Sequence, residues 1–171
     1  GIFRIWGRNP LLFRPGDAAP DGLPVRYQTV SPALGFSFEK AALRDFQVFG
    51  DEDSFLDFYG ASGPEASRVA AMDLDRNYLV AIHQGLCPTG GYSVRVTSVR
   101  ARVDTVTVTV DFQEPGPDDI VTMAMTTPRL FLLVPRRRGA SNPVFRFRGQ
   151  DGALLAERRP AYGKAAPNAQ S

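Results

Sequence analysis

A period-two alternation of apolar and polar residues dominates the middle of the chain and restricts it to a β-rich fold. From Val106 to Phe112 every second residue is apolar, and the residues between are Thr107, Thr109 and Asp111. Successive side chains of a strand point to opposite faces, so this pattern places all the apolar side chains on one face. The segment is therefore predicted to be a strand of a sheet that buries one side.

The segment before it, residues 92–103, shows the same alternation with one interruption. Apolar residues stand at even positions up to Val96 and at odd positions from Val99 onward. One extra residue in a strand produces this slip, so we predict a β-bulge near Thr97-Ser98. A tight turn at Val103-Asp104 then joins the two strands in a hairpin.

Short apolar runs separated by glycine and proline continue this pattern along the chain, which has 16 Gly and 14 Pro. Such punctuation is typical of antiparallel strands joined by turns, and residues 15–24 read as a loop. Further strands are predicted at Phe3–Ile5, Leu11–Phe13, Val25–Val30, Leu34–Phe38, Phe46–Phe49, Tyr78–His83, Ile120–Thr126, Leu130–Val134, Val144–Arg148 and Ala153–Arg158.

Helix signals are confined to residues 51–71. Asp51 stands where a helix N-cap is expected, two acidic residues follow it, and Phe55 and Tyr59 are spaced by one helical turn before Gly60. Glu65–Ala71 is a second short candidate. The predicted fold class is therefore mainly β, an antiparallel β-sandwich or barrel-like pair of sheets with one or two short helices near residues 51–71.

Composition excludes several classes of function. One Cys and one His exclude an internal disulfide framework and a zinc site, and we expect neither metal nor cofactor. A net charge of +2 argues against a nucleic-acid partner. Residues 39–75 hold nine acidic residues against three basic ones, and residues 129–171 hold nine basic against two acidic. This asymmetry either makes the molecule dipolar or brings the two segments together.

Catalytic signals are weak, and we expect no enzyme. His83 lies inside an apolar run, and no Gly-rich phosphate loop or dinucleotide motif is present. The one enzymatic alternative is a thiolate–imidazole pair of Cys87 with His83, which needs the loop after the strand to fold back.

The most informative motif is the loop candidate Cys87, Pro88, Thr89, Gly90, Gly91 and Tyr92. Proline fixes its own φ, and the glycines allow backbone geometry that other residues avoid. We predict a projecting loop that presents Thr89 at its tip and contacts a partner. A simple Gly-Gly hairpin turn is the alternative. A second contact loop is expected around Pro115, Gly116 and Pro117, within residues 115–119.

These elements together resemble the PrcB C-terminal domain family, which is named for a lipoprotein subunit of a bacterial surface serine-protease complex. The resemblance spans roughly residues 46–135. It rests on Met72–Asp75, the apolar strand ending at Gly85, Pro88–Tyr92, Pro115–Pro117, Val121-Thr122 and Thr127-Pro128.

The resemblance implies a non-catalytic, secreted or cell-envelope protein that assembles with a protein partner, such as a protease. Membrane attachment is expected only through a leader or lipid outside this sequence, and a homodimer is an open possibility. We divide the chain into N-terminal strands at 1–45, a PrcB-like domain at 46–135, a C-terminal hairpin at 136–159 and a flexible tail at 160–171.

The Pro88–Tyr92 loop is also similar to the Asn-Pro-Thr-Thr-Gly-Tyr loop of chagasin-like cysteine-protease inhibitors. Here Cys87 stands in place of the Asn, and Gly90 in place of the second Thr. Protease inhibition is therefore one alternative function. A structural role in a surface layer is another.

Overall fold

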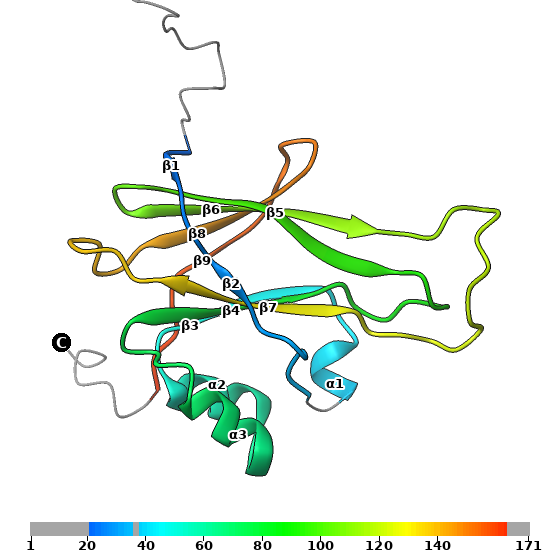
Figure 1. The fold of residues 1–171 in the computed structure, drawn as a ribbon, viewed down its shortest axis with the longest axis horizontal. Coiled ribbons are helices and arrows are strands. Elements are labelled where there is room, and N and C mark those ends of the chain that lie inside the picture. The colour runs from blue at the N-terminus through cyan, green and yellow to red at the C-terminus, as the bar shows by residue number, and fades with distance from the viewer. Residues whose placement is uncertain (1–20, 36–37, 164–171) are drawn as a thin grey trace, which may run out of the picture.

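The computed structural model describes residues 21–35 and 38–163, which form two stacked β-sheets with helices on one side (Figure 1). The five-stranded sheet has the order β1 (Leu23–Pro24), β5 (Ser93–Arg102), β6 (Thr105–Gln113), β8 (Val144–Gly149) and β9 (Leu154–Arg158). The four-stranded sheet has the order β2 (Gln28–Thr29), β7 (Arg129–Pro135), β4 (Asn77–His83) and β3 (Asp45–Phe49). The mainly-β prediction is confirmed, and the form is a sandwich of two sheets.

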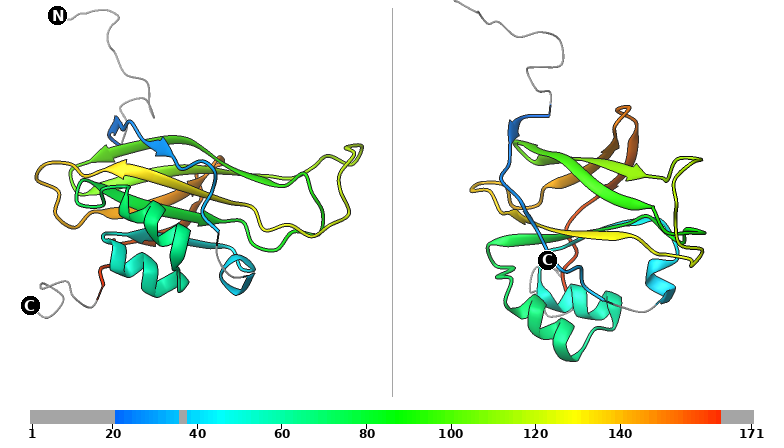
Figure 2. Two further views of the ribbon diagram at one scale, coloured as in Figure 1. Left: turned by 60° about the horizontal axis from the view of Figure 1, so that its bottom comes forward. Right: turned by 45° about the vertical axis from the view of Figure 1, so that its right-hand side comes forward.

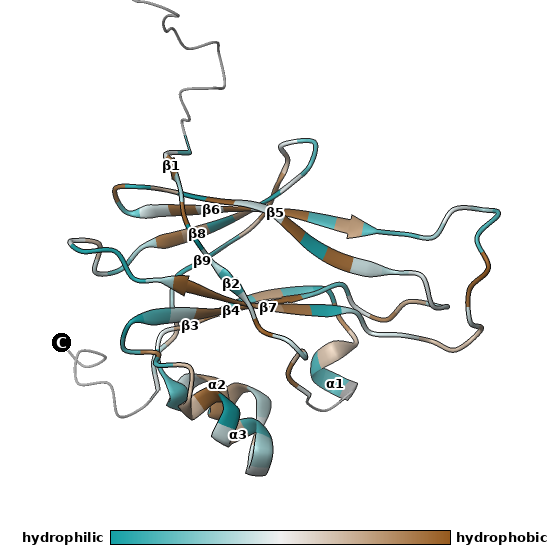
Figure 3. Ribbon diagram, viewed as in Figure 1, coloured by the Kyte–Doolittle hydropathy of each residue, from teal (hydrophilic) through white to brown (hydrophobic). Residues whose placement is uncertain are grey.

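The main core lies between the two sheets. Its side chains include Val106, Val108 and Val110 from the alternating strand, and they face Val80 and Ile82 of β4. Strands β3 to β8 contribute alternate residues, as two sheets packed face to face require. Figure 3 shows the resulting apolar bands along the strands.

A second core lies on the other face of the four-stranded sheet, under the helices α2 (Glu52–Tyr59) and α3 (Gly63–Ala70). Phe55 and Tyr59 of α2 pack there against Phe49 and Phe131. Strand β4 is therefore covered on both faces, which is why Tyr78–Ile82 is apolar throughout. Figure 2 shows the three layers, with a further short helix, α1 (Phe38–Ala41), beside them.

Both ends of the described chain cross from one sheet to the other along the sandwich edges. At one edge β1 pairs with β5, and the chain then continues into β2, which pairs with β7. At the opposite edge β9 pairs with β8, and the chain then reaches the end of β3. There Ala161 N–H donates to Val48 O at 2.8 Å, and Gly50 N–H donates to Ala161 O at 2.7 Å. Pro160–Gly163, part of the segment predicted as a flexible tail, thus packs against the domain instead of fraying.

Several local predictions are confirmed. The β5–β6 register shifts between Val96 and Ser98, so the bulge lies where the slip in the alternation placed it. Val103 has a φ of 48° in the tight turn between these strands. Helix α2 begins after Asp51, whose side chain accepts a hydrogen bond from Ser54 N–H, and it ends at Gly60 in the left-handed conformation.

Other local predictions are wrong. Ile120–Thr126 is a connection with a single bridge at Thr126 instead of a strand. Within Leu34–Phe38, the described Leu34 and Gly35 lie outside any strand and Phe38 begins α1. Leu23–Pro24, expected in a loop, forms β1, and only Gln28–Thr29 of Val25–Val30 is strand. The sheets also contain one parallel pair, β6 with β8. The N-terminal strands predicted at Phe3–Ile5 and Leu11–Phe13 lie outside the described residues. Of the helices in the described part of the chain, none has the length and apolarity to cross a membrane.

Candidate functional site

The two predicted contact loops lie together at one end of the sandwich. The inner loop, residues 84–92, joins β4 to β5, and the outer loop, residues 114–128, joins β6 to β7. Both connections leave the same end of the sheets, and the outer loop extends farthest at the right of Figure 1. We call the two loops together the tip.

Backbone hydrogen bonds tie the inner loop to the outer loop. Cys87 N–H donates to Thr126 O at 2.8 Å, and Thr126 N–H donates to Cys87 O at 2.9 Å. Gly90 N–H donates to Thr122 O at 3.0 Å, and the Thr126 hydroxyl donates to Thr89 O at 2.8 Å. The inner loop is therefore not a free projection: Thr89 is half-buried, with its carbonyl bonded to the outer loop.

The glycine pair of the motif allows the two loops to touch. A Cβ on Gly90 would lie 2.5 Å from the Thr122 hydroxyl oxygen. Gly91 has a φ of +88°, and a Cβ there would lie 2.8 Å from Val121 Cγ1 and 2.9 Å from Pro115 Cβ. The two glycines are thus needed for close approach as well as for the turn.

The base of the tip is anchored to the sandwich. Leu86 N–H donates to Ala42 O at 2.9 Å, and the Gln84 side-chain amide donates to Gln113 O at 3.2 Å. The Arg44 guanidinium lies 4.0 Å from the centre of the Phe112 ring and donates to Gln84 O at 3.3 Å. The tip is therefore held at both its base and its centre.

The surface of the outer loop is unusually apolar. Ile120 is fully exposed, Met123 is 84% exposed and Met125 is 66% exposed, and Leu86 of the inner loop is 44% exposed. Exposed apolar side chains are unremarkable singly, but a group of them on one loop indicates a contact surface. Figure 3 shows an apolar stretch on this outermost connection.

The charges on the tip are all negative. Glu114, Asp118 and Asp119 are exposed, and neither loop contains Lys or Arg. Asp119 also closes a small turn, since its carboxylate accepts a hydrogen bond from Gly116 N–H at 2.7 Å. The tip thus presents apolar side chains flanked by carboxylates.

The structure places the predicted contact residues unevenly. Pro88, Gly91, Gly116 and Pro117 are exposed; Thr89, Gly90, Tyr92 and Pro115 are half-buried; Cys87 is buried. The exposed Ile120, Met123 and Met125 were missed, because their apolar spacing was interpreted as a strand. The sequence signal near them is their position between the turn-forming Pro115-Gly116-Pro117 and Pro128, which favours a connection over a strand.

Cys87 and His83 are each engaged in separate contacts. The Tyr59 hydroxyl and His83 Nε2 are 2.8 Å apart, and the imidazole packs against Phe131 in the core under the helices. Burial lowers the pKa of His83 to about 4. The Cys87 thiol donates to Gly85 O at 3.6 Å, and burial raises its pKa, opposite to the change that activates a thiolate nucleophile.

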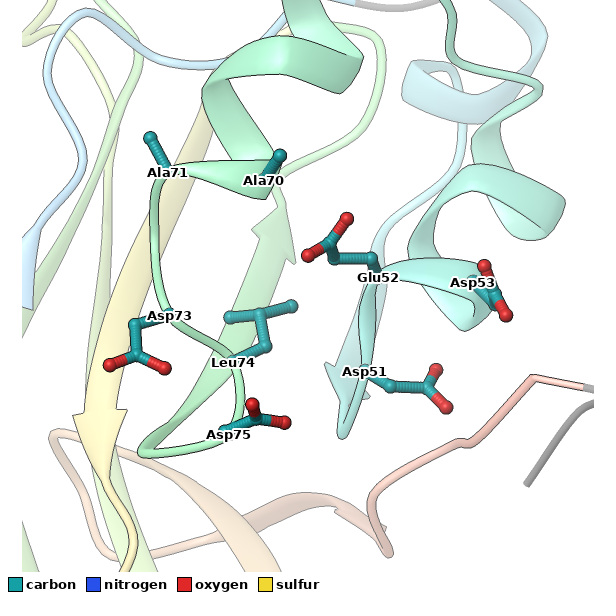
Figure 4. Close-up of a pocket in the computed structure, with 8 residues that line it drawn as sticks. All are labelled: Asp51, Glu52, Asp53, Ala70, Ala71, Asp73, Leu74 and Asp75. Carbon is teal, nitrogen blue, oxygen red and sulfur yellow. The ribbon is translucent and has the colours of Figure 1, made fainter. Parts of the chain in front are cut away.

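A shallow depression near α2 and α3 is lined by five carboxylates, those of Asp51, Glu52, Asp53, Asp73 and Asp75 (Figure 4). In Figure 4 Asp53 and Asp73 lie on opposite sides and their carboxylates do not converge. Among the described residues no group of three or more His, Cys, Asp or Glu side chains is arranged to hold a metal ion.

Part of the arginine-rich segment 129–171 folds against the acidic segment 39–75. The Arg136 guanidinium donates to Leu74 O at 2.7 Å. Arg158 donates to Phe46 O at 3.0 Å and lies 3.9 Å from the Asp45 carboxylate. The two oppositely charged segments are thus partly brought together, which is one of the two arrangements that the charge asymmetry allowed.

Comparison with known proteins finds one family match. Residues 78–135 match a family model described as PrcB C-terminal. The matched segment runs from β4 to the end of β7 and includes both loops of the tip. No curated protein and no solved structure matches the chain.

Proposed function

We propose, from the match of residues 78–135 to the PrcB C-terminal family model, that this chain is a non-catalytic interaction module that serves a protease complex as an accessory subunit. On this proposal the protein is located in the bacterial cell envelope or is secreted. The observation that carries the proposal is the tip, where the two loops of the family segment are bonded together and present Ile120, Met123 and Met125 to solvent.

The tip has the properties of a docking surface. Its backbone is already ordered by hydrogen bonds between the loops, so binding costs less conformational entropy than the ordering of a free loop. Methionine side chains are flexible and polarizable, and they adapt to irregular apolar partners. Fully burying one such side chain contributes roughly 1.5–3 kcal/mol.

The chemistry of the tip restricts the partner. Ile120, Met123 and Met125 fit an apolar groove, and the carboxylates of Glu114, Asp118 and Asp119 fit basic side chains at its rim. Charges at a rim mainly accelerate association and are screened by salt. Binding should therefore slow at high ionic strength, while the apolar contact still holds the complex together.

The state of the two reactive side chains supports a non-catalytic role. His83 Nε2 is occupied by the Tyr59 hydroxyl, and the Cys87 thiol is buried under the outer loop with a raised pKa. An active thiolate–imidazole pair requires an accessible thiol of lowered pKa beside the imidazole.

Affinity capture with matched variants tests the proposal. The purified chain, immobilised and exposed to a detergent extract of the envelope, should retain a stoichiometric protease or protease subunit. The double variant Ile120→Asp, Met123→Asp should lose it. Leu23→Asp, at another exposed apolar residue (76%) on β1, should retain it. Circular dichroism and thermal melts confirm that all three proteins are folded.

The outcomes separate the two parts of the proposal. Equal capture of the same partner by the double variant refutes the role of the tip. A tip-dependent partner with no relation to a protease refutes the protease-complex assignment. Titration of the chain into papain-like and subtilisin-like proteases adds a direct measurement: inhibition at micromolar protein would replace the accessory role with an inhibitory one.

A further inference from the structure

We propose that Met123 and Met125 are sites of oxidation to methionine sulfoxide and that this modification switches off docking by the tip; the second half rests on the function proposed above. The chain has four sulfur-containing side chains, Met72, Met123, Met125 and Cys87. The structure divides them into two accessible and two protected side chains, and the accessible pair belongs to the docking surface.

The two methionines of the tip are open to solvent. Met123 is 84% exposed and Met125 is 66% exposed, and both belong to the outer loop. Met72, in contrast, is partly buried and packs against the core under the helices. A dissolved oxidant therefore reaches the thioethers of the tip before that of Met72, and the molecule carries its own internal control.

The thiol does not compete with the tip for the oxidant. Cys87 is 5% exposed, its Sγ donates to Gly85 O, and its backbone is paired with that of Thr126 through two hydrogen bonds. Oxidation of cysteine proceeds through the exposed thiolate, which burial disfavours here. The first sulfur atoms to react are thus those of Met123 and Met125.

The oxidation needs only two reactants, the methionine thioether and hydrogen peroxide. A sulfur lone pair attacks one peroxide oxygen, the O–O bond breaks, and a new S–O bond forms. The sulfur is oxidised by two electrons, hydrogen peroxide is reduced by two, and one molecule of water leaves. Reduction of the sulfoxide by the two methionine sulfoxide reductases, one for each epimer, restores the thioether.

Oxidation changes the property on which docking depends. A sulfoxide is polar and chiral, and burying its oxygen in an apolar groove without a hydrogen-bond donor is unfavourable. The carboxylates of Asp118 and Asp119 in the same loop only accept hydrogen bonds, and the tip has no Lys or Arg. The tip therefore offers no cationic side chain that could donate a hydrogen bond to the sulfoxide oxygen. Docking should weaken by about tenfold or more when both methionines are oxidised.

Selectivity is measured first and needs no partner. The folded full chain is treated with increasing hydrogen peroxide, quenched, digested with trypsin and analysed by mass spectrometry. Met72, Met123 with Met125, and Cys87 fall in three different tryptic peptides, because Arg residues separate them. Met123 and Met125 should gain oxygen faster than Met72 by a factor on the order of ten. Equal rates at the three methionines would overturn the assignment of the tip as the oxidation site.

The switch is measured on the same samples with a defined apolar probe, retention on a phenyl-agarose column. Oxidised wild-type chain should elute earlier, and the sulfoxide reductases should restore its retention. The double variant Met123→Leu, Met125→Leu keeps an apolar tip without sulfur, so peroxide should leave its retention unchanged. Unaltered retention of fully oxidised wild type would refute the switch. Loss of partner capture is a separate readout, so failure of the docking proposal leaves the oxidation result interpretable.

Discussion

The close contact between the two loops of the tip makes a sharp prediction for Gly91→Ala. Gly91 has a φ of +88°, and a Cβ there would lie 2.8 Å from Val121 Cγ1 and 2.9 Å from Pro115 Cβ. Gly152 is a matched control, because its φ is +86° and a Cβ there would have no neighbour within 4 Å. Both substitutions carry the cost of a left-handed alanine, roughly 1–2 kcal/mol. Only Gly91→Ala adds the cost of overlap, roughly 1–3 kcal/mol.

Urea unfolding of the two variants measures the difference. Gly91→Ala should be less stable than Gly152→Ala by about 1–3 kcal/mol, with the same dependence on denaturant. Hydrogen exchange adds a local readout, because the Gly90 N–H that donates to Thr122 O should lose protection in Gly91→Ala alone. Equal stability of the variants, together with unchanged protection at Gly90, would refute the packing of the inner loop against the outer loop.

Three further predictions concern the framework. His83 is the only histidine, and its pKa of about 4 in the folded state lies below the ordinary 6.5, so the unfolded chain takes up a proton first as the pH falls. The free energy of unfolding should therefore fall by up to about 1.4 kcal/mol per pH unit as the pH drops from 6.5 toward 4. The variant His83→Gln should lack this slope between pH 6.5 and 5. Asp51 accepts hydrogen bonds from Ser54 N–H and Gly163 N–H, so Asp51→Ala should cost roughly 1–3 kcal/mol in urea unfolding, and a loss below 0.5 kcal/mol would contradict both roles. Val103 is an exposed β-branched residue with a φ of 48°, so Val103→Asn should raise the free energy of unfolding by roughly 1 kcal/mol, and a lowered melting temperature would count against strain at this turn.

The parts of the fold that sequence predicted well are those set by neighbours along the chain. The bulge at Val96–Ser98 follows from a change in the phase of alternation, since a slip of one residue would otherwise turn apolar side chains to the outer face. The start of α2 follows from the capping geometry of Asp51. Each of these features depends on a few consecutive residues, so a single segment carries the whole signal.

The errors arise where distant segments decide the outcome. Ile120–Thr126 has the apolar spacing of a strand, but a strand needs partners for its backbone groups all along its length. Here only Thr126 forms a β-bridge, with Cys87, and Thr122 adds one hydrogen bond from Gly90 N–H. Leu23–Pro24 was predicted as loop because of its prolines and glycines, yet the free edge of β5 accepts it. Neither result can be read from the segment itself, because the decisive hydrogen bonds come from residues far along the chain.

The same division applies to the candidate site. The Pro-Thr-Gly-Gly-Tyr motif at residues 88–92 was recognisable from the sequence, since glycine and proline restrict the backbone locally and carry the family resemblance. Only the tertiary structure brings this motif against the 114–128 loop and leaves Ile120, Met123 and Met125 outside any core. Local sequence thus determined that the chain folds into strands of alternating polarity with a bend at Pro88–Gly90. Which apolar residues are buried and which remain for a partner was decided by long-range pairing, because burial depends on what packs against a side chain.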